Sequence, residues 1–332
     1  MTSSLVRFAP DRAILVAAVL TAAAVAALVG FAPRVLVSLL TQALIVSFLA
    51  LGVGVLIRLS GLVTFGHAAP FGLGAYGAAW VLAPNGPFAP EIGLAVVVLG
   101  IGLVFWLIGL IVGRVEGIAF GMLTLALGQA VHVAAGKFRH LTGGSDGLIV
   151  DLPRRLFGAR SDVLQNPYGM LVITAAIMAL VLFLLRAFER TRAGRLAVAV
   201  RENEERVRFL GYRTRALKAL VFALSAALPA LGGVLFTLHQ GFVSPEVLTW
   251  GFSGHALIMA ILGGTVALWG PVAGALVFFV LREELGGITT HWLAILGTTL
   301  IVVTVVWPTG LAGAAAALKR RLAGSVGQGG AA

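Results

Sequence analysis

VLVSLLTQALIVSFLALGVGVLI, residues 35–57, is a run of 23 residues that contains no charged side chain. An α-helix of about 20 apolar residues is long enough to cross the hydrocarbon core of a bilayer. The whole chain has the same character, since its mean hydropathy is +1.03 and 59% of its 332 residues are apolar against 11% charged. So little charge could not cover the surface of a soluble domain of this length. The composition predicts an all-α, polytopic membrane protein.

Apolar stretches of membrane-spanning length recur along the chain and predict about ten transmembrane helices. They are Ala13–Phe31, Val35–Ile57, Leu62–Leu82, Ile92–Val112, Gly117–Gly136, Tyr168–Leu185, Leu217–Leu238, Leu248–Leu262, Pro271–Leu285 and Trp292–Trp307. The first resembles the apolar part of a signal peptide, but a second apolar stretch follows at once, so we interpret it as an uncleaved span. The eighth and ninth are short, at about 15 residues each.

The basic residues predict the orientation, because cytoplasmic loops of membrane proteins are enriched in Lys and Arg. With ten spans and a cytoplasmic N-terminus, 17 of the 24 basic residues lie inside and seven outside. The C-terminus then also lies in the cytoplasm, and the net charge of +11 requires no nucleic-acid partner. We expect one transmembrane domain, residues 1–318, with a cytoplasmic loop at 190–216, an external loop at 137–166 and a cytoplasmic tail at 319–332.

The predicted cytoplasmic loop has the sequence RTRAGRLAVAVRENEERVRFLGYRTRA and lies in the most highly charged region of the chain. From Arg186 to Lys218, ten of the 24 basic residues occur in 33 positions, together with four Glu. An apolar row runs through the same stretch, which predicts a short helix with a charged and an apolar face that binds a soluble partner. Gly211 marks its end. The residues expected to make the contact are Arg195, Arg201, Glu202, Glu204, Glu205, Leu210, Gly211 and Tyr212.

Polar residues within the third and fifth spans are the candidates for a substrate pathway: Thr64, His67 and Gln129. A polar or ionisable side chain inside a span usually faces the bundle interior or a water-filled path. The alternative is that neighbouring helices satisfy these side chains and that they serve packing. A G-x-G-x-x-G pattern at Gly72, Gly74 and Gly77 lacks the strand and acidic residue of a dinucleotide site. It favours close approach of helix backbones instead.

Two glycine-rich turns also admit either a structural or a functional interpretation. The external loop offers a docking surface for an outside partner, or is an ordinary connection; its candidates are Thr142, Gly143, Gly144, Asp146, Gly147, Arg154 and Arg155. A second turn separates the eighth and ninth spans, and its candidates are Gly263, Gly264, Gly270 and Pro271.

The sequence contains no arrangement typical of catalysis or metal binding. It has no cysteine, and its six histidines are scattered without metal-ligand spacing. A phosphate-binding G-x-x-x-x-G-K-[ST] loop is missing, so ATP-driven transport requires another chain. An ion-coupled secondary transporter, the alternative from another class, needs carboxylates near the membrane midplane, whereas every Asp and Glu here falls in a loop or at a span end.

Five stretches resemble, in order and spacing, the permease subunits of branched-chain amino acid ABC importers of the LivM type. They are GLVTFGHAAPFGLGAY, TGGSDGL, AVRENEERVRFLGY, GFVSPE and LGGTVALWGPVAGA. The resemblance covers roughly residues 43–313 and implies the ABC importer permease fold in a bacterial inner membrane. It also implies a second permease subunit of the LivH type, two ATPase subunits that bind ATP and Mg, and a periplasmic or extracellular substrate-binding protein. The chain itself would bind no cofactor.

The resemblance also gives the surface regions their roles. The cytoplasmic loop, and the turn between the eighth and ninth spans, would contact the ATPases. For the external loop our hypothesis rests on charge instead: its net charge of +2 is unusual on the outer side, so its basic groups would contact acidic patches of the binding protein. The substrate would be leucine, isoleucine or valine; similar permeases serve importers of urea, short amides or aromatic acids, and these stay as alternatives.

Overall fold

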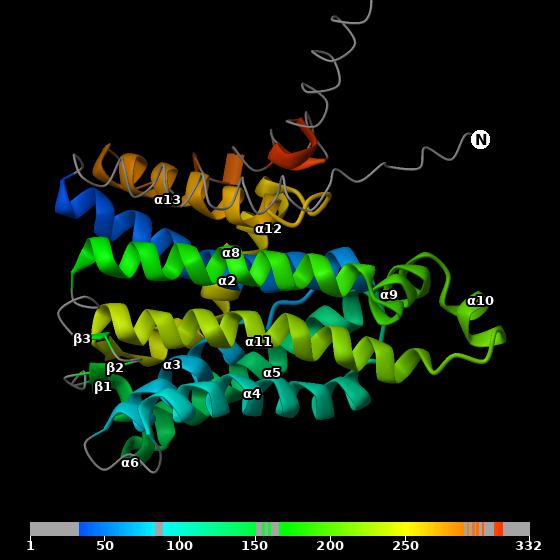
Figure 1. The fold of residues 1–332 in the computed structure, drawn as a ribbon, viewed down its shortest axis with the longest axis horizontal. Coiled ribbons are helices and arrows are strands. Elements are labelled where there is room, and N and C mark those ends of the chain that lie inside the picture. The colour runs from blue at the N-terminus through cyan, green and yellow to red at the C-terminus, as the bar shows by residue number, and fades with distance from the viewer. Residues whose placement is uncertain are drawn as a thin grey trace, which may run out of the picture.

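Long apolar helices run side by side in the computed structural model, which describes residues 33–83, 89–150, 155–156, 159–160 and 166–288 and short stretches between 291 and 314 (Figure 1). The α-helices are α2 (Arg34–Ser60), α3 (Ala68–Leu82), α4 (Pro90–Val112), α5 (Gly117–Lys137), α6 (Arg139–Thr142), α8 (Pro167–Arg190), α9 (Arg192–Glu202), α10 (Glu204–Phe209), α11 (Thr214–Gln240), α12 (Trp250–Gly263) and α13 (Gly270–Ile288). Two short 3₁₀ helices, η1 (Gly144–Asp146) and η2 (Pro245–Leu248), lie in connections. The predicted all-α class is confirmed.

Among the described residues, five helices are long and apolar enough to cross a membrane: α2, α4, α5, α8 and α11. The helices α3 and α12 are apolar but shorter, with 15 and 14 residues. Each predicted span from the second to the ninth contains one helix of the structure. The first predicted span lies outside the described residues and the tenth is described only in part, so the count of ten stays a prediction.

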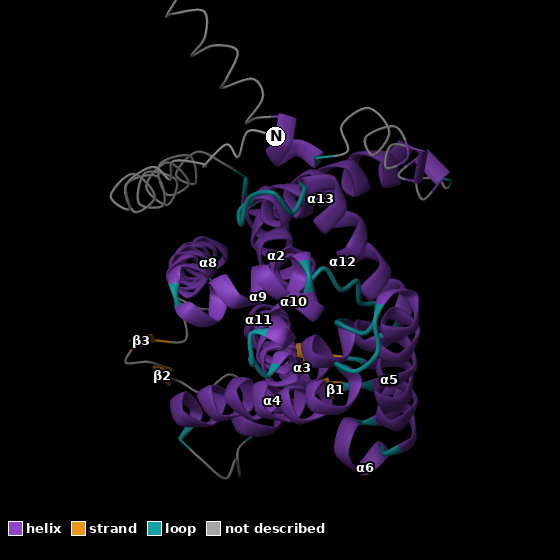
Figure 2. Ribbon diagram, turned by 90° about the vertical axis from the view of Figure 1, so that its right-hand side faces the viewer, coloured by secondary structure: helices purple, strands orange, loops and turns teal. Residues whose placement is uncertain are grey.

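The centre of the bundle is α11, which packs against α2, α3 and α4. Figure 2 views the bundle from the end that carries α10 and shows α11 in the middle and α5 at the edge. Glycines let these helices approach closely, because a Cβ at Gly74 would lie 2.2 Å from the Ala230 carbonyl oxygen and one at Gly233 1.9 Å from that of Phe71. The predicted backbone contact at Gly74 is therefore confirmed.

The third predicted span is helical only from Ala68 onward, which corrects the expectation of a helix over Leu62–Leu82. Helix α2 ends at Gly61, in the left-handed region at φ 70°, and α3 begins only at Ala68. The six residues 62–67 between them run as non-helical chain. A 15-residue helix covers about 22 Å. Helix α3 therefore needs part of the preceding segment to reach across a bilayer core of about 30 Å.

The connections gather at the two ends of the bundle (Figure 1). At one end, strand β1 (Leu148–Ile149) pairs antiparallel with β4 (Phe242–Val243), and β2 (Arg155–Leu156) pairs with β3 (Ala159–Arg160). At the other end lie α9 and α10. The predicted external loop is thus tied to the connection after α11 by the pairing of β1 with β4, which was not predicted from the sequence.

Candidate functional site

The extended segment that interrupts the third span presents alternate residues to opposite sides. Leu62, Thr64 and Gly66 are buried, whereas Val63 and Phe65 are each 38% exposed. This period of two is the pattern of an extended chain with one face against protein. The segment therefore has an open face made of two apolar side chains and their backbone groups.

Helix α5 holds the inner face of this segment. The Phe65 amide donates to the Thr124 hydroxyl oxygen over 3.3 Å, and that hydroxyl donates to the Gly121 carbonyl over 2.9 Å. Gly66 lies so close that a Cβ there would be 2.1 Å from the Thr124 carbonyl oxygen. Only glycine fits this contact without displacing a backbone.

Behind the segment, His67 is 1% exposed and both of its ring nitrogens have partners. Nδ1 lies 3.0 Å from the Thr64 hydroxyl and Nε2 lies 3.2 Å from the Ser225 hydroxyl. The Ser225 hydroxyl donates its proton to the Phe222 carbonyl over 2.8 Å, so it accepts from the ring. A neutral imidazole with its proton on Nε2 satisfies the whole set, with Thr64 donating to Nδ1. The hydrogen bonds tie the segment to α11.

A third element secures the point at which the helix resumes. The Ala68 amide donates to the Ser253 hydroxyl of α12 over 2.8 Å, and the Ala69 amide donates to the Gly66 carbonyl over 3.1 Å. The first amides of α3 are thereby satisfied within the protein. Hydrogen bonds from α5, α11 and α12 thus stabilise the non-helical segment that interrupts the span.

The open face of the segment leaves backbone acceptors free. Within the described part of the chain, no hydrogen bond reaches the carbonyl oxygens of Val63, Thr64 and Phe65. Non-helical backbone at membrane depth is tolerated where it is buried in protein or lines a water-filled cavity. Thr64 is fully buried, so its carbonyl is enclosed by protein, and the carbonyls of the exposed residues Val63 and Phe65 are the ones that face water or another protein chain rather than lipid.

The structure brings two of the three predicted pathway residues together. Thr64 and His67 are hydrogen-bonded to each other, whereas Gln129 lies on the exposed side of α5, away from the side that holds Gly66. Sequence reasoning missed the hydroxyls that complete the cluster, those of Thr124, Ser225 and Ser253. Serine and threonine are common in apolar helices, so their identity alone gave no signal.

The predicted cytoplasmic loop forms two helices, α9 and α10, instead of the single short helix expected. Asn203 ends α9 and begins α10, where its side chain accepts from the Arg206 amide over 2.8 Å. Because Asn at this position caps a new helix, the chain turns there. The predicted stop at Gly211 is confirmed by its positive φ of 87°.

The tip of this two-helix unit exposes apolar side chains. Phe209 is 90% exposed, Leu210 70% and Tyr212 51%. Three adjacent large apolar residues in water are unfavourable unless a partner covers them. Of the predicted contact residues, Leu210, Gly211 and Tyr212 belong to this tip, and Phe209, the most exposed, was not among them.

The charged residues predicted to make the same contact divide into two groups. Arg195, Glu202 and Glu205 are exposed. Arg201 instead donates to the Arg58 carbonyl over 2.9 Å, which fastens α9 to the end of α2. Glu204 is also turned inward and bonds the base of α11. Part of the charge in this loop therefore attaches the loop to the bundle.

Glu204 is the most strongly perturbed of these groups. Burial by itself raises the pKa of its carboxyl. Hydrogen bonds from Lys218 and Thr214, and the positive charge of that lysine, act the other way and bring the pKa to about 2. The carboxylate is consequently ionised throughout the physiological range.

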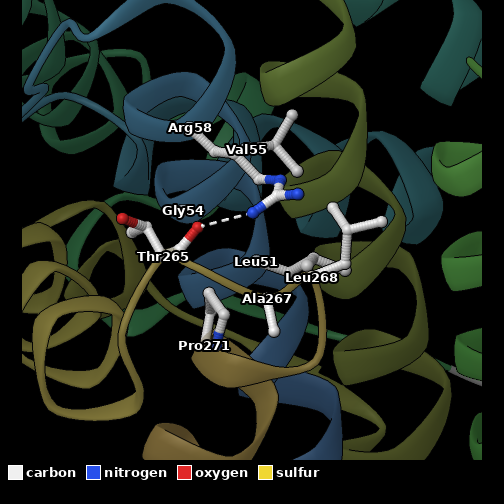
Figure 3. Close-up of a pocket in the computed structure, with 8 residues that line it drawn as sticks. All are labelled: Leu51, Gly54, Val55, Arg58, Thr265, Ala267, Leu268 and Pro271. Carbon is white, nitrogen blue, oxygen red and sulfur yellow. Dashed lines mark hydrogen bonds between the residues drawn. The ribbon is translucent and has the colours of Figure 1, made fainter. Parts of the chain in front are cut away.

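The glycine-rich turn between α12 and α13 packs beside the end of α2. Arg58 donates through Nη1 to the Thr265 carbonyl over 3.0 Å and to the Val266 carbonyl, and its Nε pairs with Glu189 of α8 at 2.5 Å. Figure 3 shows the arginine reaching over the small hollow formed by this turn and α2. The hollow has no space for a water molecule, so it is a packing contact rather than a ligand site.

The four predicted residues of that turn serve its tight geometry. Gly264 has a φ of 82°, and a Cβ at Gly270 would lie 2.0 Å from the Gly264 carbonyl oxygen. Gly263 and Pro271 are buried at the ends of the two helices. Val266 and Trp269, between them, are 56% and 46% exposed and lie at the same end as Arg58.

The predicted external loop forms an ordered turn in its described residues. Gly143, Gly144 and Gly147 all have φ near +70°. The Thr142 hydroxyl donates to the Ala135 carbonyl over 2.5 Å and accepts from the Gly144 amide over 3.2 Å. Asp146 is exposed. Of the two predicted arginines, Arg154 lies outside the described residues and Arg155 is described only as backbone of β2.

No group of His, Cys, Asp or Glu side chains in the described residues could hold a metal ion.

Comparison with known proteins gives a consistent picture. A family model described as branched-chain amino acid transport system / permease component matches residues 35–305. The high-affinity branched-chain amino acid transport system permease protein LivM of Escherichia coli K12 is 29% identical over 300 residues, which cover 83% of this chain and 69% of that protein. The LivM of Salmonella typhimurium LT2 matches with the same identity and coverage. The autoinducer 2 import system permease protein LsrC of Escherichia coli O9:H4 is 30% identical over 179 residues, 53% of this chain and half of that protein. No solved structure matches the chain.

Proposed function

Because the chain belongs to the family of branched-chain amino acid transport system permease components, we propose that it is the membrane subunit of a binding-protein-dependent importer of leucine, isoleucine and valine. ATP hydrolysis on two separate subunits would drive transport. A second permease subunit of the LivH type would complete the membrane part, in the inner membrane of a bacterium, with both termini of this chain in the cytoplasm.

The observation that supports a pathway is the open face of the extended segment 62–67. Val63 and Phe65 offer apolar surface there, and the free carbonyl oxygens offer hydrogen-bond acceptors. A branched-chain amino acid has an ammonium group that donates hydrogen bonds and an apolar side chain, and this face offers a partner to each of them; the carboxylate of the substrate needs a partner elsewhere. The face carries no fixed charge, which keeps binding weak enough for release. In this proposal Thr64 and His67 support the lining from behind.

The exposed side of α5 continues this surface. Gln129 is the polar residue on a stripe that also contains Met122 and Val133. A lone amide is costly against lipid, so we expect this stripe to face the pathway or the second permease subunit.

The two ends of the bundle suit the other partners. The apolar tip at residues 209–212, together with Val266 and Trp269, would contact the ATPases. The external loop, including Arg154 and Arg155, would contact the binding protein; basic groups there would accelerate association with an acidic surface in a salt-dependent way.

The substrate is the part of this proposal with the most alternatives. The similarity to LsrC, whose system imports autoinducer 2, covers half of the chain. The family resemblance also leaves urea, short amides and aromatic acids as alternative substrates. The apolar face described above favours a branched-chain amino acid over each of these alternative substrates.

Cysteine accessibility in the reconstituted importer tests the pathway directly, because the native chain has no cysteine. Val63→Cys and Phe65→Cys should react with a water-soluble thiol reagent, and leucine delivered by the binding protein should slow the reaction. The matched control is Leu99→Cys on α4, whose side chain is 72% exposed and should face lipid. If the two segment variants react no faster than the control, or if only urea or an aromatic acid protects them, the proposed pathway or substrate is wrong.

A further inference from the structure

One buried ammonium group connects three elements at the end of the bundle that carries α10. The Lys218 side chain, in the second turn of α11, is only 7% exposed. Its Nζ donates to the Glu116 carboxylate over 2.6 Å and also to Glu204. Glu116 immediately precedes α5, and Glu204 is the first residue of α10. A single side chain thereby links the exposed tip to the start of α5.

The link on the α10 side is the stronger one. The other oxygen of Glu204 accepts from the Thr214 hydroxyl over 2.8 Å and from Arg208 over 3.1 Å. Helix α10 therefore moves with the first turns of α11. On the α5 side, the described contact is the one ion pair to Glu116, whose side chain is 65% exposed.

Helix α5 in turn leads to the extended segment. Thr124, two turns into α5, receives the Phe65 amide, and its backbone lies against Gly66. The path from the tip thus runs through Glu204, Lys218 and the start of α5 to residues 65 and 66. Each step is a hydrogen bond, an ion pair or a tight backbone contact rather than a loose apolar surface.

We propose that Lys218 is a positioning residue that couples displacement of α10 to α5, and through α5 to the open face of the segment. This inference rests on the proposed function only in assigning the force on α10 to an ATPase. A buried charge cluster can also serve stability alone, and pairing by itself does not separate the two roles.

Glu116→Gln is the variant that distinguishes a coupling role of Lys218 from a role in stability alone. Its side chain is mostly exposed and makes no capping hydrogen bond to α5, so the fold should tolerate the change. The substitution removes the charge that holds the start of α5 and leaves Lys218 paired with Glu204. Arg208→Gln is the matched control, because that side chain is also 65% exposed and also bonds Glu204, but lies off the path to α5.

The measurement is the number of substrate molecules imported per ATP hydrolysed by the complete importer in proteoliposomes. Glu116→Gln should retain its binding-protein-stimulated ATPase rate and lose about tenfold in this ratio, the effect of one charge-assisted hydrogen bond. Arg208→Gln should keep the wild-type ratio. The proposal is overturned if Glu116→Gln keeps that ratio or if both variants lose it equally.

A second measurement does not depend on the substrate. Spin labels at Arg114→Cys, before α5, and Arg206→Cys, on α10, report whether the two elements move as a unit; both side chains are exposed. Without the Glu116 substitution, the distance distribution should stay narrow when ATP is added, and with Glu116→Gln it should broaden. Equal distributions in the two backgrounds contradict the coupling even if transport is established. A narrow distribution in an importer that rejects branched-chain amino acids supports the coupling and contradicts only the proposed substrate.

Discussion

The contact between Gly66 and α5 yields a graded prediction for three glycines. A Cβ placed at Gly66 would lie 2.1 Å from the Thr124 carbonyl oxygen, whereas ordinary contacts begin at 3.4 Å. One placed at Gly128 would lie 3.3 Å from the Gly66 Cα, and one at Gly136 would meet nothing within 4 Å. None of the three has a positive φ, so backbone strain does not confuse the comparison. The three alanine variants therefore differ in the space available for one methyl group.

The magnitudes follow from that space. In Gly66→Ala the segment and α5 must separate by about 1 Å, and overpacking of this kind costs about 1–3 kcal/mol. The separation also weakens the bond from the Phe65 amide to Thr124, which contributes about 0.5–1.5 kcal/mol. Gly136 lies in the last turn of α5, so Gly136→Ala should raise the free energy of unfolding by less than the roughly 1 kcal/mol expected in a helix interior. Gly128→Ala should fall between the two, because a shift of a few tenths of an ångström accommodates it.

The assay is the apparent melting temperature of the purified permease, followed by intrinsic tryptophan fluorescence, together with uptake per permease in proteoliposomes. The melting temperatures should rank Gly136→Ala above Gly128→Ala above Gly66→Ala. Uptake should fall sharply only for Gly66→Ala, since the open face moves with the segment. A Gly66→Ala protein that melts and transports like Gly136→Ala would refute the close packing of the segment on α5 and the pathway built on it.

Three further predictions concern the groups around this segment and the two-helix unit. His67→Ala should lower turnover more than the amount of protein in the membrane, and Ser225→Ala, which removes one of the two ring partners, should do so less; uptake divided by immunoblot signal measures this. Arg58→Lys, which keeps the charge but loses the forked contact with Glu189 and the turn carbonyls, should lower the unfolding free energy by about 1–3 kcal/mol, seen in a thermal melt. The depressed pKa of Glu204, about 2 against an ordinary 4.5, means that this carboxylate stabilises the attachment of α10 at all pH values above about 4.5. That contribution is lost as the pH falls from 4.5 toward 2, so a fluorescent label on α10 should report no change between pH 8 and 5, and Glu204→Gln should remove the acid transition.

Much of the helical layout could be predicted from hydropathy, because a lipid-facing helix must be apolar along its whole length. The helices α2, α4, α5, α8 and α11 are found where the apolar runs predict them. The grouping of loops into two ends also agrees with the predicted topology, as the contact of Arg58 with Val266 illustrates. These features depend on composition over about 20 residues, and composition is read reliably from one sequence.

The extended segment could not be predicted because it depends on three distant elements. The sequence GLVTFG, residues 61–66, is apolar enough to belong to the third predicted span, and Gly61 alone does not predict six non-helical residues after it. The hydroxyls of Ser225 and Ser253 that hold it lie 158 and 185 residues away from their partners. The one indication in the sequence is the pair of polar residues within the segment, Thr64 and His67, and both are among the predicted pathway residues. Gln129 carried the same signal but lies elsewhere, since polarity alone does not say which side of a helix a residue occupies.

The two helices of the charged loop are attached to the bundle in different ways. Helix α9 is anchored by Arg201, which bonds the end of α2, and its apolar side packs on α2, α8 and α11. The residue it bonds, Arg58, is itself fixed to α8 and to the turn after α12. Beyond Asn203 the situation changes, because α10 has one buried apolar side chain, Val207, and is otherwise held through Glu204. The tip at residues 209–212 is therefore joined to the bundle in two ways: through α9, which contacts α2, α8 and α11, and through the ionic contacts of Glu204, which lead to α11 and the start of α5.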